Sequence, residues 1–129
     1  MRKVIQPKKL SDPRPRYSQA ILVTKPGKLL FIAGQTAVDA NGNVVGKRDI
    51  EAQARQVFEN LNTVLKEAGG SIDNIVKTTT YITDVKYREG LNKVRREYYK
   101  KTAPTSTLIV VKGLAHEDYL LEIEAIAVL

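Results

Sequence analysis

Two glutamates near the end of the sequence form the clearest pattern that could do chemistry. Between Leu120 and Val128, strand-like alternation puts Glu122 and Glu124 on one face together with Ile126. Their Cα atoms would then stand about 7 Å apart. Carboxylates held that close can act as acid or base on one substrate if their face lines a cleft or a subunit interface. The structural alternative is a wet sheet edge, or carboxylates paired with nearby lysine or arginine.

The rest of the sequence is poor in catalytic groups. It has no cysteine and one histidine, His116, so thiol chemistry, metal sites and a Ser-His-Asp triad have no support. No glycine-rich phosphate loop occurs. We therefore expect no metal site. Tyr17, which follows Arg16 in a basic leading segment, is the other candidate.

Length and charge bound the class of protein. A chain of 129 residues is expected to form one domain, residues 1–129. It contains no apolar run of signal or membrane-spanning length, so we expect a cytoplasmic protein with no membrane partner. The net charge of +7 suits anionic partners, nucleic acid or metabolites, although a solvated surface explains it more simply. The basic cluster over 86–101, which includes Arg95, falls mostly opposite the apolar stripe of its helix and is interpreted as solvated.

Local patterns predict two helices and five strands. Residues 18–35 are expected to form a β-hairpin, because two aliphatic runs flank Pro26-Gly27, a pair suited to a tight turn. Asp49 is placed to cap a helix whose apolar stripe continues until Gly69-Gly70 ends it. Two amphipathic helices need one apolar sheet face, so the pattern predicts an α+β fold. The remaining segments are a strand over 75–85, a helix over 87–98, and strands over 106–111 and 120–128.

Several stretches resemble one protein family over nearly the whole chain. They are PRYSQAI (15–21), AGQTAVDANGNVVG (33–46), QARQVFENLNTVLKEAGGSIDNIVKTTTYITD (53–84) and EIEAIAV (122–128). Together these stretches are similar to the RidA/YjgF family. The resemblance implies a chorismate-mutase-like fold, with two helices packed on one face of a single sheet. It also implies a homotrimer that holds small-molecule ligands in clefts between subunits.

The resemblance implies an activity as well. Active family members hydrolyse reactive 2-imino acids and enamines to 2-keto acids and ammonia, without a cofactor. Glu122 matches the family glutamate that activates water, and Tyr17 matches a tyrosine that encloses the substrate from a neighbouring subunit. The expected substrate-binding positions are Ala33, Gly34, Asn92, Thr105, Ser106 and Thr107.

One departure from the family pattern bears on this activity. Thr105 stands where an arginine clamps the substrate carboxylate, and Ala33 replaces a serine. Arginine offers a fixed, bidentate positive charge, whereas threonine offers one neutral hydroxyl. Losing such a contact in a secluded cleft costs about 2–5 kcal/mol, so a simple 2-imino acid should bind poorly. Arg14 or Arg16 could reach in from the leading segment to compensate.

Three functions therefore stay open at this point, and whether the chain is an enzyme is among the open questions. The first is a RidA-like hydrolase, an enamine/imine deaminase with altered or reduced activity. The second is a non-catalytic trimer that binds a small metabolite. The third, less favoured, is RNA binding or ribonuclease action, which suits the positive charge.

Overall fold

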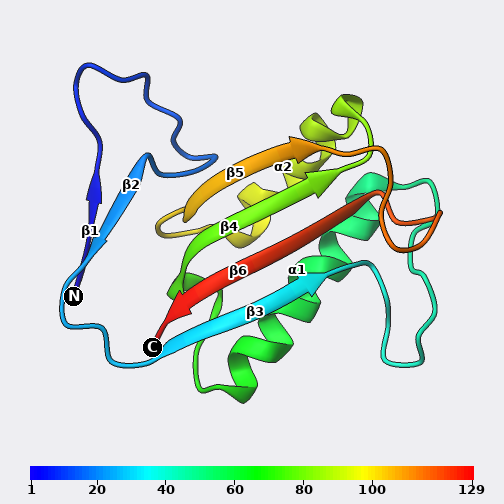
Figure 1. Cartoon of the computed structure of the whole chain (residues 1–129), viewed down its shortest axis with the longest axis horizontal. Helices are drawn as coiled ribbons and strands as arrows, with labels where there is room; N and C mark the ends of the chain where they lie inside the picture. The colour runs from blue at the N-terminus through cyan, green and yellow to red at the C-terminus, as the bar shows by residue number, and fades with distance from the viewer.

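A four-stranded mixed sheet forms the centre of the protein, whose computed structural model describes all 129 residues. The strands β3 (Leu29–Gln35), β6 (Leu121–Val128), β4 (Ile75–Ile82) and β5 (Thr105–Val110) lie side by side in that order. β4 and β5 run parallel, and β6 runs antiparallel to both of its neighbours. Figure 1 shows α1 (Ile50–Glu67) and α2 (Arg88–Tyr98) behind one face of this sheet, with the other face uncovered. The predicted α+β fold, with two helices on one sheet face, is confirmed.

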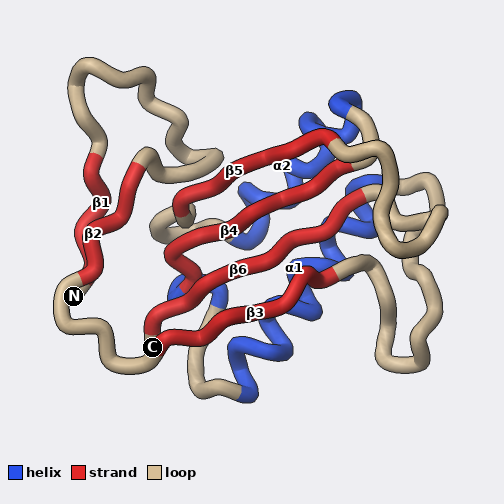
Figure 2. The backbone as a smooth tube through the Cα atoms, in the orientation of Figure 1, coloured by secondary structure: helices blue, strands red, loops and turns tan.

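The first two strands form a separate ribbon. β1 (Arg2–Ile5) and β2 (Ala20–Val23) pair only with each other, antiparallel, outside the four-stranded sheet (Figure 2). The predicted hairpin over residues 18–35 is therefore wrong in this chain, because β2 pairs with β1 while β3 pairs with β6. Both aliphatic runs do form strands. The local pattern does not encode which strand each one pairs with.

Local signals placed α1 correctly. The Asp49 side chain accepts a hydrogen bond from the Ala52 N–H at the start of the helix, and Gly69 adopts a positive φ of 87° just after its end. The second helix follows a short 3₁₀ turn, η2 (Val85–Tyr87), and a similar turn, η1 (Ile72–Asn74), precedes β4. Neither α1 nor α2 is long and apolar enough to cross a membrane. Four members of the predicted stripe of α1 are buried in the core, Ala54, Val57, Leu61 and Leu65, and Phe58, which the stripe did not include, is buried beside them.

Alternation along β6 divides the sheet into a dry face and an open face. Leu121, Ile123 and Ala127 are buried under the helices, as the period of two predicts. Glu122 and Glu124 therefore stand on the uncovered face. Loop backbone on the covered side is fixed by Gln53, a fully buried polar side chain of α1.

The Gln53 side-chain amide forms hydrogen bonds with two distant loops. Its Nε2 donates to the carbonyl oxygens of Gly46 (3.2 Å) and Asp118 (2.7 Å), and its Oε1 accepts from the Leu120 N–H at 2.9 Å. Buried peptide groups that lose their partners destabilise a fold more than an average hydrogen bond stabilises it. Gln53 thus holds the start of β6 against α1.

We expect the substitution Gln53→Leu to lower the free energy of unfolding by about 2–5 kcal/mol. It leaves the partly buried Asp118 carbonyl and Leu120 N–H without partners, whereas the Gly46 carbonyl keeps its bond from the Asp49 N–H. Urea denaturation followed by circular dichroism measures this. Gln56→Leu is the matched control, since Gln56 lies on the same helix and donates only to the Asn60 side chain. Equal stability of the two variants would show that Gln53 does not anchor the loops.

Candidate functional site

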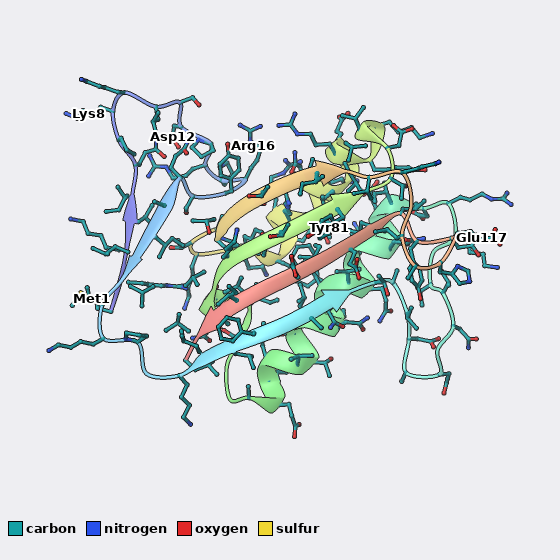
Figure 3. The ribbon with its side chains drawn as sticks, viewed as in Figure 1. Met1, Lys8, Asp12, Arg16, Tyr81 and Glu117 are labelled. Carbon is teal, nitrogen blue, oxygen red and sulfur yellow. The ribbon has the colours of Figure 1, made fainter.

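The Glu122 carboxylate lies on the open face, directly over Gly34 of β3. A Cβ atom on Gly34 would lie 2.5 Å from the Glu122 Oε1 atom, so only glycine leaves room for the carboxylate there. Tyr81, the partner of Glu122 in the β4–β6 register, donates its hydroxyl to Glu124 at 3.0 Å. This bond raises the pKa of Tyr81, whose position on the open face is visible in Figure 3. Glu122 itself makes no hydrogen bond within the chain, so its carboxylate is available to a ligand or a water molecule.

A shallow hollow of about 360 Å³ lies beside Glu124 on the same face. Its floor is largely apolar, from Phe31, Ala33 and Ile126, and Lys77 and Glu124 bring opposite charges to it. The predicted site residues Ala33 and Gly34 are therefore close to Glu122 and Glu124, on neighbouring strands. We refer to Gly34, Glu122 and their surroundings as the glutamate corner.

A second pocket, of about 290 Å³, lies between α2, β5 and the leading segment. It brings together three predicted site residues, Tyr17, Asn92 and Ser106, and adds Arg16 at its rim. Figure 3 shows Arg16 on the leading segment near the start of β5. No acidic residue lines this pocket. We refer to it as the arginine pocket because its remaining polar lining comes from Arg88 and Arg95.

Arg95 is the unexpected member of this pocket. Its residue is only 5 % exposed, and its Nη1 donates to the Asn92 Oδ1 at 3.1 Å. Its Nη2 donates to the hydroxyl oxygens of Thr80 (3.1 Å) and Ser106 (3.4 Å). Burial lowers the pKa of Arg95, yet a guanidinium stays protonated in proteins. No carboxylate pairs with it, so the fold buries a positive charge that only neutral oxygens solvate.

The interpretation of Arg95 as part of a solvated basic cluster is therefore wrong. The sequence did contain the signal that would have found it. Arg95 lies four residues after Leu91 and three before Tyr98, so helical spacing places it on the apolar side of α2. Sorting the basic residues individually by helix position, instead of as a cluster, would have singled it out.

The two threonines of the expected site lie elsewhere. Thr105 donates its hydroxyl to the Val76 carbonyl oxygen at 2.8 Å, and Thr107 is exposed opposite Thr79 on the open face. Thr105 and Glu122 lie two strands apart across the sheet and four residues apart along it. Their Cα atoms are therefore roughly 16 Å from each other. Within one chain, Thr105 and Glu122 do not share a pocket. Arg14 is taken up by an ion pair with Asp12, whereas Arg16 does line the arginine pocket.

Comparison with known proteins identifies the family. Residues 8–129 match the family model described as Endoribonuclease L-PSP. The chain belongs to the RidA/YjgF family. A RutC family protein of Pyrococcus horikoshii is 39% identical over 98% of both chains. The 2-iminobutanoate/2-iminopropanoate deaminase of Homo sapiens is 30% identical over 99% of this chain and 90% of its own length.

Solved structures of the RidA/YjgF family share the fold to different degrees. The Rid-family protein YyfB of Yersinia pestis, 35% identical, superimposes with a TM-score of 0.91 over 99% of this chain and 98% of its own. Another Rid-family protein of Yersinia pestis, YyfA, is also 35% identical and covered completely, yet its TM-score is 0.73. The family fold is thus shared with both proteins. The arrangement of some part of this chain is closer to that of YyfB.

We expect Gly34→Ala to abolish ligand chemistry at the glutamate corner without unfolding the protein. The new methyl group would overlap the Glu122 carboxylate, which must then rotate away, while the backbone of β3 accepts alanine readily. If the chain hydrolyses imines, as the name of the human relative indicates for that protein, formation of the 2-keto acid should fall at least tenfold with little change in the melting temperature. The matched control is Gly113→Ala, because a Cβ atom at Gly113 would meet nothing within 4 Å. An active Gly34→Ala variant would show that this close approach has no functional role.

Proposed function

We propose that this protein is a cofactor-free hydrolase of 2-imino acids and their enamine tautomers, with Arg95 as the anchor for the substrate carboxylate. The observation that carries the proposal is the buried Arg95 guanidinium, which has no acidic partner and faces a pocket shared with Tyr17 and Asn92. The deaminase name of the human relative gives the same reaction class.

The arginine pocket suits a small carboxylate for electrostatic reasons. An isolated charge in a protein interior is costly unless a counter-charge or several hydrogen bonds compensate it. Three N–H groups of Arg95 are bonded to neutral oxygens, and two, the Nε–H and one Nη1–H, remain available to donate to a ligand. Arg16 and Arg88 add positive charge at the same pocket. A carboxylate would neutralise a charge that the folded chain leaves uncompensated.

This anchor lies in a different place from the family arginine that Thr105 replaces. Arg95 reaches the pocket from α2, behind Ser106, instead of from the start of β5. We propose that the reaction class is retained and that the preferred substrate is altered, because the carboxylate must sit deeper, on the helix side of the strand. The reduced binding expected from Thr105 alone would then be offset by Arg95.

The two halves of the proposed site cannot meet within one chain. Arg95 contacts Thr80 of β4 and Ser106 of β5 on the helix-covered face, whereas Glu122 of β6 stands on the open face. We propose that the arginine pocket of one subunit faces the glutamate corner of another in a homotrimer. The ligand would then occupy a cleft between subunits.

In this arrangement Glu122 acts as the general base. It accepts a proton from water as the water oxygen bonds to the imine carbon and the C=N π electrons move to nitrogen. The same proton is delivered to nitrogen. Glu122 then takes the proton of the carbinolamine hydroxyl and passes it to nitrogen as the C–N bond breaks. Ammonia leaves and the carbonyl of the 2-keto acid forms, so that one water is consumed for each ammonia released. Arg95 holds the carboxylate throughout and takes no part in proton transfer.

The family description also names an endoribonuclease, but the arginine pocket, of about 290 Å³, fits a small anion better than an RNA strand. Other basic residues of the chain are used within the fold: Lys93 is paired with Glu51 at 2.9 Å, and Arg55 with Glu97 at 2.7 Å. Phosphate contacts along a nucleic-acid backbone need several free cations in a row. Imine hydrolysis is therefore the function we propose.

The substitution Arg95→Met tests the anchor. We expect kcat/KM for 2-iminobutanoate, generated in the assay and followed against its spontaneous hydrolysis, to fall by about thirty-fold to several-thousand-fold. The melting temperature should stay the same or rise, because an unpaired buried charge is replaced by an apolar side chain of similar length. The control is Arg96→Met at the neighbouring exposed position. Unchanged kcat/KM in Arg95→Met would refute the assignment.

Glu122→Gln separates a hydrolase from a non-catalytic binder. The amide keeps the shape of the carboxylate but cannot accept the proton from water, so kcat should fall at least a hundred-fold. Binding of the product 2-oxobutanoate, measured by calorimetry, should persist because Arg95 is unchanged. If the unmodified protein binds the 2-keto acid without turning over the imine, the binding hypothesis replaces the hydrolase.

A further inference from the structure

The outer edges of β2 and β3 are both unpaired in the single chain. β3 is an end strand of the four-stranded sheet and bonds only to β6, while β2 bonds only to β1. Both edges carry large exposed apolar side chains: Leu29 is 55 % exposed, Phe31 71 % and Leu22 53 %. Free apolar edges are templates for pairing with another strand, and folded proteins normally cover them.

The N-terminal arm, residues 1–23, is held on the opposite side of the sheet from β3. Ser18 donates its N–H to the Pro104 carbonyl and forms a parallel bridge with Thr105 at the start of β5. Lys28, at the other end of the connection, exchanges two backbone hydrogen bonds with Leu129 beside β3. Figure 1 shows the ribbon standing outside the sheet, joined to β3 by this extended connection. The arm therefore does not fold back on the strand that follows it.

The two Yersinia pestis structures indicate that some part of this chain is placed differently among its relatives. Their TM-scores differ by 0.18 at equal sequence identity and nearly complete coverage. Multiplied by the 129 residues of the chain, this difference corresponds to about 23 residues placed elsewhere. The arm has that size. The arm also contributes no residue to the buried hydrophobic cluster.

We propose that the arm is exchanged between copies of this chain, so that β2 of one copy pairs antiparallel with the β3 edge of another. The pair Pro26-Gly27, which predicts a tight turn, would then join β2 and β3 without pairing them. Each of these two strands would pair with a strand of another copy. In the register of a two-residue turn, Leu22 lies opposite Phe31, so the exchange covers the two exposed side chains with each other. Each copy gives one arm and receives one, which closes a ring by head-to-tail contacts.

Exchange would also connect the assembly to the arginine pocket. Arg16 and Tyr17 follow the loop of the arm and line the pocket of their own chain. The same arm would be clamped at its β2 end by the sheet of a second copy. Ligand binding at Tyr17 and pairing at β3 would then stabilise the same arm from its two ends.

Paired cysteines test the exchange, because the natural sequence contains none. In Leu22→Cys/Phe31→Cys, oxidation of the assembled protein should produce covalent oligomers on a denaturing, non-reducing gel. The matched control is Leu10→Cys/Phe31→Cys, since Leu10 is exposed to the same degree (52 %) but lies outside β2. It should remain largely monomeric under the same conditions.

Two results would overturn the exchange. A monomeric band with both thiols consumed would show that the hairpin closes within one chain, and a monomer with both thiols free would show that the edges stay unpaired. Ala20→Cys/Ala33→Cys repeats the test with small side chains in the same register, in case replacing Phe31 disturbs folding. Both pairs must give covalent oligomers for the proposal to stand.

Discussion

The period of two residues along β6 is the constraint on which the rest of the structure depends. This strand lies inside the sheet, between β3 and β4, so one of its faces must be apolar enough to carry α1. Leu121, Ile123 and Ala127 meet that demand and are buried. The same alternation fixes Glu122 and Glu124 on the open face, and a slip of one residue would exchange the two sets. The core and the glutamate corner are thus specified by one register.

The second constraint acts on the opposite side of the sheet and works against stability. Arg95 occupies a position of α2 that its spacing from Leu91 assigns to the core, where a leucine would pack at less cost. The fold gives it three hydrogen bonds to neutral oxygens and no counter-ion. A destabilising residue held in place by its surroundings, beside a pocket, is the pattern that functional sites commonly show. Packing gives no reason for a charge at this position.

Local sequence signals predicted the elements well and their partners poorly. The capping side chain of Asp49, the end of α1 at Gly69 and the alternation of β6 each depend on neighbours within a few residues. The hairpin over 18–35 failed because strand pairing is a contest between distant segments, and β1, hidden in a basic leading segment, gave no signal of its own. Arg95 was assigned to a solvated surface because the basic residues over 86–101 were considered together. Whether each of them is buried depends on its own position on the helix.

A single chain of this protein has one contiguous core, but the two parts of its candidate site lie apart. Its buried apolar residues all come from the central sheet, both helices and the loops between them. The candidate catalytic groups, in contrast, lie on two faces of a sheet that separates them. No rearrangement of side chains can bring the Arg95 guanidinium to the Glu122 carboxylate through β4. If both groups act on one substrate, assembly is therefore part of the catalytic machinery, and a change at the subunit interface would alter activity without altering the stability of the fold.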